Sequence, residues 1–297
     1  MDPAIVTGGL TKDYGAHRAL DGLNLRVERG EIFGFLGPNG AGKTTTIRLL
    51  LDLIRPTSGG ARILGFDCRR ESHRVRAVTG YLAGDVRLYG DLTVRRTVGL
   101  FAALRQRPTD PAFLDDLAER LDLDLAHHVG TLSKGNRQKL GIVLALQGRP
   151  DVLLLDEPTS GLDPLVQQAV WEILRAEAAR GTAVFFSSHV MSEVEHVCGR
   201  VAVLRGGHLV AVEPIARLKG KELRRLEVTF DTPVPVDAFR IPHVRELGRR
   251  GTTVTLEIAE NLDQVIKALG RFPVVDLRTE QPSLDEVLLA FYQEARR

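Results

Sequence analysis

The segment GPNGAGKT, residues 37–44, restricts the fold of this chain more than any other part of the sequence. It lies between a predicted strand at 31–36 and a helical run, KTTTIRLLLDLI, that begins at Lys43. Its three glycines allow successive backbone N–H groups to point inward and let an anion approach the backbone closely. The match to G-x-x-x-x-G-K-[ST] therefore predicts a phosphate-binding loop, and a plain glycine-rich turn between a strand and a helix is the alternative.

Each part of this loop has a predicted task. Lys43 adds a positive charge toward the β- and γ-phosphates of a nucleotide, and the helix that follows adds its positive N-terminal end. Thr44 offers a hydroxyl to Mg²⁺. The residues predicted to bind the nucleotide here are Gly37, Pro38, Asn39, Gly40, Ala41, Gly42, Lys43, Thr44 and Thr45.

A second segment, DVLLLDEPTSGLDP at 151–164, places two adjacent acids at the end of an apolar run. The run predicts a strand buried on both faces, and acids at its end need a partner because unpaired buried charge is unfavourable. We expect Asp156, on a strand adjacent to the strand of the loop, to hold Mg²⁺ directly or through water. We expect Glu157 to face the γ-phosphate and to orient or deprotonate the attacking water. The alternative is a pair of acids that caps the turn after the strand.

Alternation of strands and helices predicts an α/β domain with a parallel sheet and right-handed crossovers. Its helical middle covers roughly 85–147, where Phe113, Leu114, Leu117 and Leu121 follow helical spacing. The predicted strands lie at 22–28, 31–36, 152–155, 182–188, 201–206 and 208–213, and a helix at 166–181 ends at Gly181.

The pattern of apolar and polar residues changes after the first domain, which we place at 1–219. Residues 220–297 predict a small separate α+β unit, because apolar and polar residues alternate there and are followed by helical spacing. Its predicted elements are strands at 226–230 and 253–259, a helix at 261–270, and a helix at 282–297 that begins with the capping-box pair Ser283 and Glu286.

Composition sets the broad class of the chain. With 297 residues, of which 43% are apolar and 26% charged, it is predicted to be globular and able to bury a core. A net charge of +2 gives no case for a nucleic-acid or membrane surface. The sequence shows neither a signal peptide nor an apolar run near the ~18 residues of a membrane helix, so we expect another chain to cross any membrane involved. Cys68 and Cys198 have no metal or disulfide spacing, which fits a reducing cytoplasm.

Four further motifs accompany the loop and the acidic strand. They are Tyr14 in LTKDYG, LSKGN at 132–136, SGLD at 160–163 and SSHVMSEVE at 187–195. In their order and spacing these motifs resemble the ATPase subunit of an ATP-binding cassette (ABC) transporter, over about residues 1–215. The resemblance implies a P-loop NTPase core with a RecA-like parallel sheet, an antiparallel β subdomain and an inserted α-helical subdomain.

The resemblance also implies roles for single residues. His189 is implied to bond the γ-phosphate and position water, and Tyr14 is implied to stack on adenine. Ser133 and Gly135, in a segment similar to the LSGGQ signature, are implied to bind the ATP held by a second subunit, whose nucleotide loop Asp163 would contact. From the residues alone the alternatives are a surface histidine at 189, a packing role for Tyr14 and a helix N-cap at Ser133.

The sequence departs from the family pattern at two places. Lys134 and Asn136 replace a glycine and a glutamine of the signature, and the basic residues of LSKGNRQK, Lys139 among them, are predicted to form a solvated helix face. Gly84, followed by Asp85, stands where the family usually has a glutamine that senses Mg²⁺ and couples to the membrane subunit. No metal ligand is therefore predicted at Gly84.

The signature and the tail PSLDEVLLAFY are similar to the ABC-2 subgroup of daunorubicin-resistance-type drug and lipid exporters. The implied function is an ATPase subunit that uses ATP and Mg²⁺ to power export through separate membrane permease subunits. It would pair with a second ATPase subunit, identical or paralogous, at the cytoplasmic face of the cell membrane.

Two alternatives remain at this stage. The first is an ABC-type ATPase that acts on nucleic acid or ribosomes, against which stands the lack of a coiled-coil insertion or a second cassette. The second is a non-catalytic, nucleotide-gated regulatory subunit, against which stand Glu157 and His189.

Overall fold

The computed structural model describes residues 2–86, 88–105, 110–220, 224–258 and 261–280. The chain divides into two compact units, Met1–Pro214 and Ile215–Arg297, each with its own hydrophobic core. The predicted boundary after residue 219 lies within a short helix, α8, at Ile215–Gly220. The predicted helix at 282–297, with Ser283 and Glu286, lies outside the described residues.

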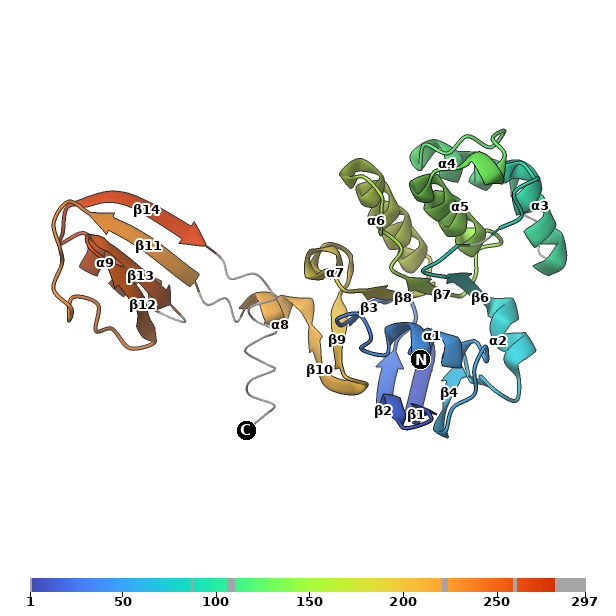
Figure 1. The fold of residues 1–297 in the computed structure, drawn as a ribbon, viewed down its shortest axis with the longest axis horizontal. Helices are drawn as coiled ribbons and strands as arrows, with labels where there is room; N and C mark the ends of the chain where they lie inside the picture. Colours follow the sequence, from blue (N-terminus) through green and yellow to red (C-terminus); the bar gives the residue numbers. More distant parts are fainter. Residues whose placement is uncertain (1, 87, 106–109, 221–223, 259–260, 281–297) are drawn as a thin grey trace. The chain divides into compact units, whose positions relative to one another are not determined.

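A six-stranded sheet forms the centre of the first unit (Figure 1). Its strands are β3 (Ile32–Leu36), β6 (Thr79–Leu82), β7 (Val152–Asp156), β8 (Ala183–Ser188), β9 (Arg200–Arg205) and β10 (His208–Pro214). Their order is β10–β9–β3–β8–β7–β6, with β10 antiparallel to β9 and all other neighbours parallel. Every residue of β3, β7 and β8 is buried, as expected for a parallel sheet covered on both faces. The five predicted strands from 31–36 onward in this unit are thus confirmed to within one residue at each end.

The acidic strand is β7, and the prediction that it is adjacent to the strand of the glycine-rich loop is wrong. β8 lies between β3 and β7. Asp156 is paired with Ser187, and Leu36 with Ser188, so the last residues of β8 stand between the loop and the acids. The long helical crossovers of a parallel sheet do not fix the order of its strands, which is why sequence order alone gave the wrong neighbour.

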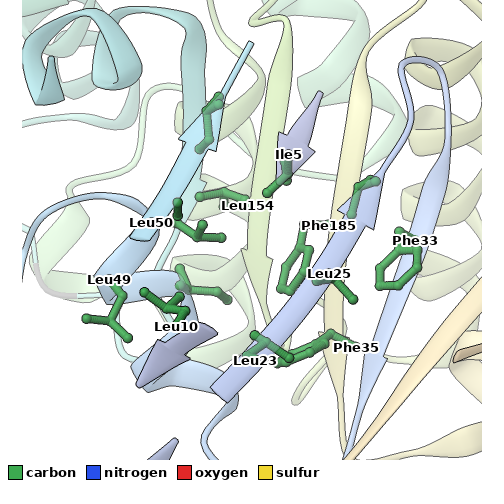
Figure 2. Packing of buried hydrophobic residues seen from close by; sticks show 14 of the residues in the cluster. Ile5, Leu10, Leu23, Leu25, Phe33, Phe35, Leu49, Leu50, Leu154 and Phe185 are labelled. Atoms are coloured by element: carbon green, nitrogen blue, oxygen red, sulfur yellow. The ribbon is translucent and has the colours of Figure 1, made fainter. Parts of the chain in front are cut away.

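An antiparallel sheet and a helix complete the core beneath the six-stranded sheet. The sheet has the order β2–β1–β4–β5, and its strands are β1 (Ile5–Tyr14), β2 (His17–Val27), β4 (Ser58–Ile63) and β5 (Phe66–Asp67). Helix α1 (Lys43–Leu50) contacts strands of both sheets, and its Leu49 and Leu50 belong to the buried cluster that also holds Leu10 and Leu154 (Figure 2). The antiparallel β subdomain implied by the resemblance is confirmed, and the predicted strand at 22–28 is the second half of β2.

Helix α1 is shorter than the predicted helical run. It ends at Leu50 because Asp52 adopts a left-handed conformation, with φ +55°. The N–H of Leu53 then donates to the carbonyl of Arg48, and the N–H of Asp52 donates to that of Leu49. This pair of bonds satisfies the last carbonyls of the helix and turns the chain toward β4.

Helices account for most of the chain between β5 and β7. They are α2 (Ser72–Val78), α3 (Val94–Arg105), α4 (Pro111–Arg120), the 3₁₀ turn η1 (Val129–Thr131) and α5 (Lys134–Leu146). Figure 1 shows α3, α4 and α5 gathered at one end of the unit; with η1 they form the helical subdomain, close to the predicted 85–147. The predicted apolar face of α4 is confirmed, because Phe113, Leu114, Leu117 and Leu121 are all buried.

Two more helices lie before and after β8 in the chain. They are α6 (Pro164–Ala179) and α7 (Met191–Val197). Arg180 caps α6, and Gly181 follows with φ +102°, as predicted for the residue after the cap.

The second unit is a small α+β fold. It contains β11 (Arg224–Phe230), β12 (Val244–Arg250), β13 (Thr253–Ile258), α9 (Leu262–Leu269) and β14 (Val274–Glu280), with the sheet order β12–β13–β11–β14. Alternate residues of β11 and β13 are buried against Val265 and Leu269 of α9. The predicted strands at 226–230 and 253–259 and the helix at 261–270 are therefore confirmed.

The two cysteines are predicted to be unreactive in the folded chain. Both are buried; burial raises the pKa of the Cys68 thiol to about 12, with a further rise from the charge of Asp67, and burial also raises the pKa of Cys198. Because the thiolate is the reactive form, we expect both thiols to react with a maleimide at neutral pH ~100-fold more slowly than in the denatured chain. Rapid labelling of the native protein, followed by mass spectrometry, would contradict this.

Candidate active site

The loop between β3 and α1 has a shape that depends on its glycines. Gly40 and Gly42 have φ values of +78° and +109°, in the region that favours glycine. A Cβ atom on Gly42 would lie 2.6 Å from the carbonyl oxygen of Ala19, and one on Gly37 would lie 2.4 Å from that of Leu204. The loop is therefore pressed against β2 and β9, and its backbone remains uncovered on the side of a neighbouring cavity.

Lys43, the first residue of α1, is buried beneath this loop. Its Nζ donates to the carbonyl oxygens of Gly37 at 2.7 Å and Pro38 at 3.3 Å, and it lies 3.7 Å from Oε1 of Glu157. Burial lowers the pKa of the Lys43 ammonium, while the nearby carboxylates of Glu157 and Asp156 act in the opposite direction. The lysine is thus a positive charge held at a fixed position, with a carboxylate beside it.

Asp156 ends β7 in a buried position and has two hydroxyl partners. Its Oδ2 accepts a hydrogen bond from Oγ1 of Thr44 at 2.7 Å, and its Oδ1 accepts one from Oγ of Ser187 at 2.6 Å. These bonds stabilise a carboxylate in a place where an unpaired one would be unfavourable. The two oxygens Thr44 Oγ1 and Asp156 Oδ2 are of the hard type that Mg²⁺ prefers.

Glu157 has a different environment from its neighbour. Its backbone is left-handed, with φ +50°, and its N–H donates to the carbonyl of Ser187 at 3.1 Å. Its Oε1 lies 2.9 Å from Nδ1 of His189 and 3.7 Å from Nζ of Lys43. The structure therefore brings Lys43, Glu157 and His189 together at the carboxyl ends of the strands, where ligands bind in open α/β sheets.

A cavity of about 260 Å³ opens beside these groups. It is lined by Tyr14, His17, Ala19, Asn39, Gly40, Gly42, Lys43, Thr44, Thr45 and Glu157. Tyr14, which is 46% exposed, stands at the end of β1, paired with His17 across the β1–β2 hairpin, and Nζ of Lys12 lies 5.0 Å from the centre of its ring. The glycine-rich loop, the tyrosine and Glu157 thus share one cavity, and His189 reaches it through its contact with Glu157. His17 was missed by the sequence reasoning, although its place one tight turn after Tyr14 could have indicated it.

The predicted signature residues lie elsewhere in the chain. Oγ of Ser133 accepts a hydrogen bond from the N–H of Asn136 at 3.1 Å and so caps α5. Asp163 caps α6 in the same way, because its Oδ1 accepts from Leu165 and Val166 at 3.1 Å each. A Cβ atom on Gly135 would lie 3.2 Å from the carbonyl of Gly161, so the start of α5 lies against the loop that leads to α6.

Ser133, Gly135 and Asp163 are not among the described residues that line the 260 Å³ cavity. Within one chain, the side chains of Ser133 and Asp163 cap helices and do not line this cavity. The role that the resemblance implies for these three residues, contact with a nucleotide held by a second subunit, stays a prediction.

Gly84 lies close to the buried acid. A Cβ atom on Gly84 would be 3.5 Å from Oδ2 of Asp156, so a longer side chain at this position would begin beside the carboxylate. On the other side of this segment is a cavity of about 430 Å³, lined by residues of the helical subdomain and of the segment after β6. Gly84, Asp85 and Gln138 are among its walls.

The prediction that the basic residues of the signature helix form a solvated face is wrong for Lys139. It is 7% exposed, and its Nζ donates to the carbonyl oxygen of Asp122 at 3.0 Å. The long apolar stem of the lysine packs inside the helical subdomain while its charged end reaches a carbonyl.

Two polar residues that touch the acids were missed by the sequence reasoning. Ser187 bonds Asp156, and its position at the end of a buried strand beside β7 was the available signal. Gln138 donates from Nε2 to the backbone carbonyls of Glu157 and Pro158. No sequence pattern connects Gln138 to that loop.

The described parts of the chain contain no group of three or more His, Cys, Asp or Glu side chains that could hold a metal ion.

Comparisons with known proteins show which family this chain resembles. Residues 20–160 match the family model described as ABC transporter. The chain is 34% identical to the daunorubicin resistance ATP-binding protein DrrA3 of Streptomyces coeruleorubidus, over all of this chain and 98% of that protein. It is 32% identical to the Nod factor export ATP-binding protein I of Rhizobium meliloti strain 1021, over 96% of this chain and 87% of that protein.

A solved structure of the ATP-binding subunit of an ABC transporter covers 73% of this chain and 92% of its own length, with a TM-score of 0.67 and 28% identity. The fold class and the family resemblance are therefore confirmed. The chain belongs to the ATPase subunits of the ABC transporter family.

Proposed function

We propose that this chain binds Mg²⁺–ATP in the 260 Å³ cavity and hydrolyses it to power export through separate membrane permease subunits. The observation that carries the proposal is the meeting of Lys43, Glu157 and His189 next to the bonded pair Thr44 and Asp156. Its support is that a daunorubicin resistance protein and a Nod factor export protein align with nearly the whole chain.

The residues of the cavity fit the phosphates and the metal. The loop 37–44 presents backbone N–H groups and the start of α1, and Lys43 adds the charge directed at the β- and γ-phosphates. Thr44 and Asp156 would hold Mg²⁺, which when bound supplies charge neutralisation at the phosphate oxygens. Tyr14 offers an exposed aromatic face for the adenine ring at the open end of the cavity.

Glu157 and His189 act on the attacking water. Glu157 orients the water and accepts its proton on the carboxylate as the water oxygen bonds to the γ-phosphorus and the bond to the bridging oxygen of ADP breaks. His189, 2.9 Å from the same carboxylate, holds the glutamate in place by donating from Nδ1 and, when both ring nitrogens carry a proton, donates from Nε2 to the γ-phosphate. Both side chains are partly exposed, as access by water requires.

A second copy, or a paralogue, completes the site in this proposal. Ser133 and Gly135 of one subunit meet the nucleotide held by the other, and Asp163 contacts the partner's loop. The support is that Ser133 caps the N-terminus of α5, a kind of helix end that favours anions, and that it does not line the cavity of its own chain.

The membrane subunit is proposed to dock on the helical subdomain. In the described parts of the chain no helix has the length and apolar character to cross a bilayer. The helical subdomain and the segment before it expose large apolar side chains: Tyr89 is 72% exposed, Leu104 72% and Leu100 37%. Leu100 and Leu104 are four residues apart on α3 and so share one face. Docking there would place the chain at the cytoplasmic face of the membrane.

Replacement of Leu104 by aspartate is expected to weaken this docking, because a charge in an apolar interface loses its hydration. We expect recovery of the chain with detergent-extracted membranes to fall at least about fivefold, while ATP binding by the purified chain stays unchanged. Leu53→Asp is the matched control, since Leu53 is 54% exposed and lies outside the helical subdomain. Equal membrane recovery for both variants would contradict docking on α3.

The proposed function as a whole is tested by purifying the full chain from membranes in mild detergent and identifying its companion. A polytopic membrane protein and Mg²⁺-dependent ATP hydrolysis are the expected results. The relatives named above give no support to the nucleic-acid or regulatory alternatives. Nucleic-acid binding with a steep salt dependence, in place of a membrane companion, would favour the first of them. A companion without any ATP turnover would favour the second.

A further inference from the structure

Gln138 connects the signature helix to the candidate catalytic loop. It lies on α5, five residues after the cap Ser133, and is 7% exposed. Its Nε2 donates to the backbone carbonyl of Glu157 at 3.0 Å and to that of Pro158 at 3.1 Å. A single buried amide group thus uses both of its N–H donors on the two residues that follow Asp156.

The loop that receives these bonds has an irregular backbone. Glu157 has φ +50°, a left-handed conformation that is unfavourable for a residue other than glycine. Within the loop, the carbonyl of Glu157 accepts one further bond, from the N–H of Ser160 at 3.2 Å. A strained conformation of this kind persists only where its surroundings hold it. Among the described side chains, Gln138 bonds the backbone carbonyls before and after Pro158, those of Glu157 and Pro158.

The same loop is held from its other end by a second amide. Nε2 of Gln167, on α6, donates to the carbonyls of Leu162 at 3.1 Å and Thr159 at 3.4 Å. Those bonds reach the part of the loop farther from the acid. The bonds of Gln138 are the ones that act on the backbone of Glu157 itself.

We propose that Gln138 is a positioning residue for hydrolysis: by holding the backbone of Glu157 it sets the carboxylate against Lys43 and His189. The proposal rests on the role proposed above for Glu157. Oε1 of Glu157 has to keep its place, 2.9 Å from Nδ1 of His189 and 3.7 Å from Nζ of Lys43, so that the attacking water stays in line. Because Gln138 belongs to α5, it also makes the position of Glu157 depend on the helical subdomain.

The competing explanation is that Gln138 only stabilises helix packing. Lys139, the next residue, provides a matched control, because it is also 7% exposed and also donates to a backbone carbonyl, that of Asp122 at 3.0 Å. Its bond lies inside the helical subdomain and away from Glu157. Replacement of either residue by methionine removes a buried donor and keeps an unbranched side chain of similar length.

The test compares Gln138→Met and Lys139→Met in the full chain, purified with its membrane companion. For Gln138→Met we expect kcat for ATP hydrolysis to fall about tenfold or more, while KM and the nucleotide Kd stay within about twofold. For Lys139→Met we expect kcat within about twofold of wild type. Thermal unfolding of both variants gives the temperature range in which each is folded. Gln138→Glu is a second variant of native size, expected to be at least as slow, because its carboxylate would face two carbonyl oxygens.

Glu157→Gln, measured in the same assay, separates the possible failures. If Glu157→Gln is slow while Gln138→Met and Gln138→Glu keep wild-type kcat, the inference about Gln138 is wrong and the proposed function stands. If Gln138→Met and Lys139→Met lose kcat equally, Gln138 has only a structural role and the inference is also wrong. If Glu157→Gln itself turns over at the wild-type rate, the proposed role of Glu157 fails, and the inference fails with it.

Discussion

Replacement of Glu157 by glutamine is expected to lower ATP turnover by about 10²–10³-fold and to leave ATP binding intact. The glutamine keeps the size of the side chain and its hydrogen bond to His189, but it cannot accept a proton from the attacking water. Binding is retained because the loop 37–44, Thr44 and Asp156 do not depend on that carboxylate for their contacts. The measurement is the steady-state rate of phosphate release, together with calorimetry of Mg²⁺–ATP binding.

The control for this prediction is Glu172→Gln, which removes an exposed carboxylate on α6 with no contact to the cavity among the described residues. Its turnover should match that of the wild type. A wild-type rate for Glu157→Gln would show that another group takes the proton. Loss of binding in Glu157→Gln would show instead that the charge next to Lys43 helps to shape the empty loop, since the two groups lie 3.7 Å apart.

The parts of this site that follow from local chemistry were predictable from the sequence. The glycine-rich loop is a local device, since its glycines, its lysine and the helix after it are consecutive residues, and its geometry is set by dihedrals that only glycine adopts easily. The two acids were equally visible, because an apolar run of three leucines into Asp156 predicts a buried strand that ends in a polar site.

The parts that depend on long-range packing were not predictable in the same way. The place of β8 between β3 and β7 is a property of the whole sheet, and with it comes the bond from Ser187 to Asp156. Gln138 reaches Glu157 across 19 positions in the sequence because α5 packs against the loop, and a helix pattern alone does not say what a buried polar side chain contacts. Lys139 was misjudged for the same reason, since a lysine in a polar run usually faces water.

Strands of mixed polarity were also missed. β12, with the sequence VRELGRR, is half-exposed or exposed along its whole length, and a bulge between Glu246 and Gly248 interrupts its alternation. Such a strand forms because β13 offers it an edge with matching hydrogen bonds, and that information lies in the partner strand.

Replacement of Lys43 by alanine is expected to weaken Mg²⁺–ATP binding by about 30-fold or more, which corresponds to roughly 2 kcal/mol. Lys43 is 6% exposed and its ammonium is fixed by the carbonyls of Gly37 and Pro38, so its charge is already in place before a nucleotide arrives. Its lowered pKa records the cost of burying that charge, which a bound triphosphate offsets by pairing with it. Calorimetric titration with Mg²⁺–ATP gives the loss of affinity directly.

The charge itself, and not the general loss of a lysine, is what this experiment has to isolate. Lys267→Ala removes an exposed lysine of the second unit, paired with Asp263, and should leave the nucleotide Kd unchanged. Lys43→Ala leaves Glu157 with His189 as its partner, so the acid stays in the site without the cation that balances it. The negative phosphates then meet an unbalanced carboxylate, and affinity should recover in part when Lys43→Ala is combined with Glu157→Gln. If the double variant binds no better than Lys43→Ala alone, the lysine acts on the phosphates independently of Glu157, and the close approach of the two side chains does not contribute to binding.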